Sequence, residues 1–79
     1  MASEAEIREE NRKVRRLQLA VGLAMNVIRQ SDLPLEEAQE LIRDTRRFAL
    51  RLFPDKAHVY DMIYQPRFQR LLAEKYRII

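Results

Sequence analysis

His58, the only histidine of the chain, lies three residues before Asp61, and this pair is the first place to look for side-chain chemistry. An imidazole and a carboxylate one helical turn apart could share a metal ion or a proton. Two ligands do not complete a metal site, and the sequence has no cysteine and no second histidine to add to them. We therefore interpret His58 as a half-exposed side chain on a helix.

A row of carboxylates at a spacing of four residues, Glu36, Glu40 and Asp44, is the second candidate for metal chemistry. Helical bundles that bind two metal ions complete such rows with Glu-x-x-His pairs from facing helices, and the sequence contains no such pair. The single glycine excludes a glycine-rich phosphate loop in practice, and no nucleophile–histidine–acid pattern occurs. We expect no catalytic residue, no cofactor, no metal ion and no small-molecule substrate, and therefore no enzyme.

Two groups of arginines are candidates for binding phosphate or an acidic partner. They are Arg12, Arg15 and Arg16 near the start of the chain and Arg43, Arg47 and Arg51 in its middle. Phosphate binding needs such side chains on one face. The first group spreads around a helix beside several glutamates, whereas the second forms a row with a spacing of four residues. A nucleic-acid surface stays open as an alternative to ion-paired, solvated helix faces.

The overall charge gives little support for nucleic-acid binding. The chain has 15 Lys and Arg residues against 12 Asp and Glu residues, and the net charge of +3 is ordinary for a soluble domain of this size. The segment 41–64 could form a helix-turn-helix, but its second helix would bring Asp55 and Asp61 toward phosphates. Its turn also lacks the usual glycine, so we disfavour this interpretation.

Hydrophobic spacing and three prolines predict four helices in one small all-α bundle that spans residues 1–79. We expect a long helix over about 4–30, a medium helix over about 35–53 and two short helices over about 55–64 and 66–77. Ser3 and Glu6 match a capping box at the start of the first helix. The broad apolar face of the second helix includes Phe48, and one side of the third helix carries Tyr60 and Ile63.

The first helix is unusually apolar. A coiled-coil-like repeat of seven residues runs through Ile7, Val14, Val21 and Ile28. Within Leu17–Ile28 the apolar arc covers well over half of the circumference, whereas a surface helix usually needs a stripe of about 100°. Two interpretations remain open. The chain covers one face while a second chain covers the other, or the helix lies at the centre of its own bundle.

We expect a non-enzymatic protein–protein interaction module that forms a homodimer through the first helix. The expected contact residues are Val14, Leu17, Leu19, Val21, Leu23, Val27 and Ile28. One alternative is a small basic nucleic-acid-binding regulator that uses the two arginine groups. Another is an accessory subunit or inhibitor that docks on a larger protein. No secretory signal or membrane-spanning stretch is recognisable, so a cytoplasmic protein is expected.

Overall fold

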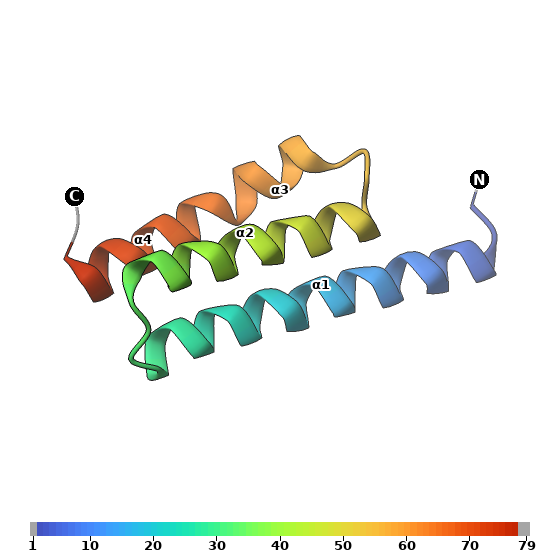
Figure 1. Cartoon of the computed structure of the whole chain (residues 1–79). Coiled ribbons are helices and arrows are strands. Elements are labelled where there is room, and N and C mark those ends of the chain that lie inside the picture. Colours follow the sequence, from blue (N-terminus) through green and yellow to red (C-terminus); the bar gives the residue numbers. More distant parts are fainter. Residues whose placement is uncertain (1, 78–79) are drawn as a thin grey trace.

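The computed structural model describes residues 2–77, which form four α-helices and no strand (Figure 1). The helices are α1 (Glu4–Gln30), α2 (Leu35–Leu52), α3 (Ala57–Ile63) and α4 (Gln65–Tyr76). The prediction of a small all-α bundle is therefore confirmed. The observed bounds differ from the predicted ranges by at most two residues. Among the described residues, none of the helices combines the length and the apolar character that crossing a membrane requires.

The long helix α1 starts at a capped end. The side chain of Ser3 accepts a hydrogen bond from the backbone N–H of Glu6 at 3.1 Å, which satisfies one of the free N–H groups of the first turn. Glu4 and Glu6 lie in this turn, where the positive end of the helix dipole favours carboxylates. The capping role predicted for Ser3 is confirmed.

The last turn of α4 holds the turn between α1 and α2 in place. The ammonium group of Lys75 donates hydrogen bonds to the backbone carbonyls of Ile28 and Ser31, and a longer one of 3.3 Å to that of Arg29. These carbonyls lie at the C-terminal end of α1, where a positive charge is favourable. The hydroxyl of Tyr76 donates to the carbonyl of Leu33 at 2.7 Å. Residues distant in sequence therefore stabilise the hairpin of α1 and α2.

The helices α3 and α4 form a bent pair rather than two separate helices. Tyr64 ends α3 and begins α4 with a helical backbone, φ −102° and ψ −31°. Pro66 lies in the first turn of α4, where the backbone N–H groups have no partner within the helix, so the missing N–H of proline costs no hydrogen bond there. If α3 continued straight through Pro66, one backbone hydrogen bond of the helix would be lost. The bend lets both short helices lie along α2 (Figure 1).

The core lies where α1, α2 and α4 meet. Phe68 and Ile28 are completely buried and are its largest fully buried side chains. The other buried apolar residues are Val21, Ala24, Ala38, Ile42, Ala49, Tyr60, Leu71 and Leu72. Thr45 is buried as well, and its hydroxyl donates to the carbonyl of Leu41 at 2.8 Å. Phe48 and Ile63, which belong to the predicted apolar faces of α2 and α3, lie outside this core and are 36% and 47% exposed.

The N-terminal third of α1 extends past the end of α2 (Figure 1). With 27 residues against 18, α1 is longer than α2 by roughly 13 Å at 1.5 Å per residue. Every residue from Ala2 to Arg12 is exposed, including Ile7 at 51%. Within the protomer, two of the four residues of the seven-residue repeat, Val21 and Ile28, are therefore buried in the core, whereas Ile7 and Val14 are exposed.

Candidate functional site

One flank of α1 carries an exposed apolar stripe, which we define as Leu19, Leu23 and Val27. Their exposed fractions are 62%, 64% and 41%. Residues four apart in a helix differ by only about 40° in direction, so the three side chains form one continuous row. Leucines exposed to this degree in a row are uncommon on a soluble domain, where single exposed apolar residues are the rule.

A different face of α1 packs into the core of the protomer. Val21 and Ile28 are buried by the chain itself, at 4% and 0% exposure, and Leu17 is half-buried against the core. The interpretation that placed the helix at the centre of its own bundle is therefore wrong. The predicted contact set must also be reduced, because a partner cannot reach Val21 or Ile28 without unpacking the core. The reduced set keeps Leu19, Leu23 and Val27 as one surface.

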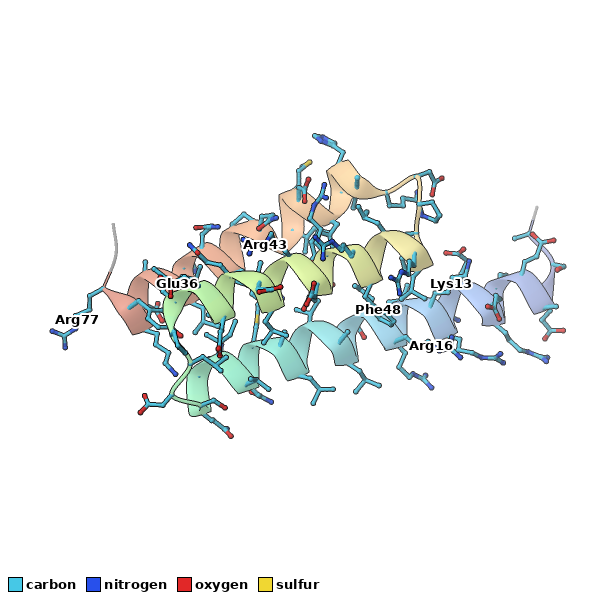
Figure 2. All side chains as sticks on the ribbon, in the orientation of Figure 1. Lys13, Arg16, Glu36, Arg43, Phe48 and Arg77 are labelled. Atoms are coloured by element: carbon cyan, nitrogen blue, oxygen red, sulfur yellow. The ribbon has the colours of Figure 1, made fainter. Side chains whose placement is uncertain are left out.

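The helix α2 adds to the same side of the molecule. Glu37, Leu41, Asp44 and Phe48 share one face of α2 because they are spaced by three or four residues. Figure 2 shows Phe48 on the side of α2 that faces α1. Leu41 is half-buried and Phe48 is 36% exposed. The apolar stripe of α1 is thus bordered by an α2 face that mixes apolar and acidic residues.

Val14 belongs to a second apolar feature, a groove between α1 and the turn from α2 to α3. Its volume is about 360 Å³. Its lining residues include Val14 and Leu17 of α1, Leu50 of α2, and Val59 and Ile63 of α3. No α-carbon of α1 lies within 8 Å of an α-carbon of α3, and the groove occupies the space between the two helices. Sequence reasoning missed it, since helical periodicity gives the face of each helix but not the distance between two helices.

Tyr60 lies at the base of this groove. Its ring is stacked at a tilt on that of Tyr64, with 5.1 Å between the ring centroids. The Tyr60 side chain is 4% exposed, and its hydroxyl has no hydrogen-bond partner among the described residues. Burial raises the pKa of Tyr60 to about 12, because the charged phenolate would lose its hydration. The hydroxyl therefore stays neutral at physiological pH.

Asp61 pairs with an arginine and not with the histidine three residues before it. The guanidinium group of Arg46 donates two hydrogen bonds to the Asp61 carboxylate, at 2.8 and 3.0 Å. These hydrogen bonds hold the pKa of Asp61 below its usual range. Both side chains are partly exposed, so the pair joins α2 to α3 at the surface. It was missed because residues on different helices show no common spacing.

The two arginine groups lie on different helices, the first on α1 and the second on α2. Figure 2 shows Arg16 on the side of α1 away from α2, and Arg43 on the side of α2 away from α1. All six arginines, Arg12, Arg15, Arg16, Arg43, Arg47 and Arg51, are exposed. Two of them have acidic neighbours on their own helix, with 3.5 Å between Arg12 and Glu9 and 2.9 Å between Arg47 and Asp44. Arg16 and Arg43, one from each group, thus point to different sides of the molecule.

Acidic residues gather at the opposite end of the stripe from Arg12 and Arg16. We define this acidic turn as Asp32, Glu36 and Glu37, which are all exposed where α1 ends and α2 begins. Within residues 2–77, no group of three or more histidine, cysteine or carboxylate residues is arranged to hold a metal ion. His58 is exposed, and Glu36, Glu40 and Asp44 lie on the surface of α2.

The chain matches no protein-family model, no curated protein and no solved structure.

Proposed function

We propose that this protein is a small protein–protein interaction module that associates with a second copy of itself through the apolar stripe. The supporting observation is the exposure of Leu19 and Leu23, at 62% and 64%, on a helix whose other flank already supplies the core. Since the core is formed without these side chains, more than half of their surface stays in contact with solvent in the single protomer. Their burial against another surface would stabilise an assembly by about 1.5–3 kcal/mol each.

The size of the chain favours a second copy as the partner. It has 79 residues and no cysteine, so no disulfide stabilises its small core. Proteins of this size without disulfides or metals often gain stability through association. A row of apolar side chains on one rigid helix also fits an identical row, because a two-fold axis brings the same residues together from both sides.

Replacement of Leu23 by glutamate tests the proposal. Leu23→Glu should leave the protomer folded, because Leu23 is exposed and glutamate forms helices almost as well as leucine. Two leucines would leave the contact and two charges would enter it, so we expect the dissociation constant of the dimer to rise on the order of 100-fold or more. Sedimentation equilibrium measures this constant, and circular dichroism checks that the helices persist.

Met62→Glu is the matched control. Met62 is 65% exposed, about as much as Leu23, but it lies on α3 and outside the stripe. The same loss of apolar surface there should leave the dissociation constant unchanged. If both variants associate like the unchanged protein, the stripe is not the contact.

Nucleic-acid binding is the competing function. Arg16 and Arg43, one from each arginine group, lie on different sides of the molecule, which weakens the case for one phosphate-binding surface. Binding to random duplex DNA at low and moderate salt separates the two functions, because phosphate contacts weaken steeply as salt rises. Binding at low salt that is lost in Arg12→Glu and Arg47→Glu would favour the competing function.

A further inference from the structure

The apolar stripe runs between two patches of opposite charge. Arg16 and Arg12 precede Leu19 by three and seven residues, so both lie on the flank of α1 that carries the stripe. Beyond the last stripe residue, Val27, α1 ends at Gln30 and the acidic turn follows. The stripe therefore has a basic end and an acidic end.

Within the protomer these charged side chains form few ion pairs. Among residues 2–77 the acidic turn forms no ion pair, and of the two arginines only Arg12 forms one, its exposed contact of 3.5 Å with Glu9. An ion pair this long and this exposed contributes little to stability. The charges at both ends of the stripe remain available to a partner.

We infer that two copies of the chain pair with their α1 helices antiparallel, on a two-fold axis close to Leu23. This inference rests on the proposed self-association through the stripe. About such an axis Leu19 of each copy lies opposite Val27 of the other, and Leu23 meets its own counterpart. Arg16 becomes level with Gln30 of the second copy, because both are seven residues from the axis. The basic end of each copy then lies beside the acidic turn of the other.

A parallel pair would place like charges together. Arg12 and Arg16 would face the same arginines of the second copy, and the two acidic turns would meet at the other end. Opposed like charges at an interface are destabilising, whereas opposite charges fix both partner and orientation. The charge pattern therefore selects the antiparallel pair, while the apolar stripe alone fits both orientations.

Spin labels on single introduced cysteines test the orientation directly, since the natural chain has no cysteine to label in addition. The labels are placed at Asn26→Cys and, in a second protein, at Gln30→Cys, both exposed positions near the stripe. In an antiparallel dimer the two Asn26 positions are offset along the helix by about 9 Å and the two Gln30 positions by about 21 Å. In a parallel dimer both offsets are near zero.

We therefore expect the label-to-label distance from pulsed electron paramagnetic resonance to increase by several ångströms from position 26 to position 30. Equal distances at the two positions in a protein of dimer mass would overturn the antiparallel orientation and leave the proposed self-association standing. A labelled or unlabelled protein that stays monomeric overturns both.

A charge exchange tests the pairing of the two ends. Arg16→Glu and Glu37→Arg should each weaken the dimer by roughly tenfold, and the two changes in one chain should restore it, because the exchanged charges attract again. Arg51→Glu, at the exposed end of α2, is the control with the same change of charge. If Arg51→Glu weakens the dimer equally, or if the double variant is weaker than both single ones, the match between the ends is overturned.

Discussion

Two tyrosine hydroxyls in the C-terminal part of the chain differ in one respect that can be measured. The hydroxyl of Tyr76 donates to the Leu33 carbonyl at 2.7 Å, whereas that of Tyr60 is buried with no partner among the described residues. A hydrogen bond within the protein stabilises the folded state by about 1 kcal/mol, and a buried hydroxyl without a partner destabilises it by a similar amount or more.

Replacement of each tyrosine by phenylalanine should therefore have opposite effects. We expect Tyr76→Phe to lower the free energy of unfolding by about 1 kcal/mol and Tyr60→Phe to leave it unchanged or raise it by up to about 1 kcal/mol. Urea denaturation of the two variants at the same protein concentration measures the difference. A loss in Tyr60→Phe as large as in Tyr76→Phe would mean that the Tyr60 hydroxyl has a partner in solution.

Residue identity alone predicted some of these roles and not others. Ser3 and Glu6 lie three residues apart, and a local pattern of this kind is enough to predict the cap that the structure shows. The pairing of Asp61 with Arg46 joins residues 15 positions apart on two helices. To predict this pair one would need to know how α2 and α3 are oriented relative to each other, and the spacing of residues within a single helix does not give that orientation.

The ion pair of Arg46 and Asp61 gives the contact between α2 and α3 a pH dependence. The folded-state pKa of Asp61 is lowered, so its contribution to stability is present above the unfolded pKa and is lost as the pH falls through the folded value. We expect the difference in unfolding free energy between the unchanged protein and Asp61→Asn to be largest at neutral pH. It should shrink below about pH 4, where aspartates begin to protonate.

A double-mutant cycle with Arg46→Met makes this result specific to the pair. Once Arg46 is absent, Asp61→Asn should have a smaller effect at neutral pH, because the carboxylate has lost its partner. Chemical denaturation between pH 3 and about pH 7 supplies the free energies. An effect of Asp61→Asn that is independent of both pH and Arg46 would contradict a stabilising role for the ion pair.

At the scale of whole helices, Lys75 is the main polar link from α4 to the end of α1. Lys75→Met keeps the aliphatic part of the side chain but removes the group that donates to the Ile28, Arg29 and Ser31 carbonyls. We expect the free energy of unfolding to fall by about 1–2 kcal/mol, since charged donors at a helix C-terminus stabilise more than neutral ones. Thermal denaturation followed by circular dichroism measures the loss.

Lys56→Met serves as the comparison for this change. Lys56 is exposed before α3 and forms no hydrogen bond through its side chain among the described residues, so its replacement should change stability by less than about 0.5 kcal/mol. Equal effects of the two lysine variants would show that Lys75 stabilises only through the overall charge.

Helix positions were predictable because prolines and periodicity are local signals, and the fold class followed from them. The sequence also showed the wide apolar arc of α1 and left two covers open for it, the chain's own helices alone or a second chain in addition. The sequence did not tell which part of the arc the chain itself would cover. That choice depends on how α2 and α4 pack on α1, and this packing leaves Leu19, Leu23 and Val27 outside the core.

At the scale of the whole molecule, the exposed stripe of α1 runs along the long dimension of an elongated protomer. The described part of the chain measures 47 by 22 by 16 Å, and its long dimension is the direction of α1 (Figure 1). A second protomer laid along this direction can cover the full stripe while leaving the groove beside α3 open. The proposed association through α1 would thus bury the apolar residues that lie outside the protomer core.

The absolute mass in solution is the most direct test of this account. Light scattering on a sizing column over a series of protein concentrations measures it without assuming a shape. We expect a mass that approaches twice the protomer mass of 9.5 kDa as the concentration rises, and a protomer mass for Leu23→Glu at the same concentrations. A mass of 9.5 kDa for the unchanged protein at every concentration would contradict self-association through α1.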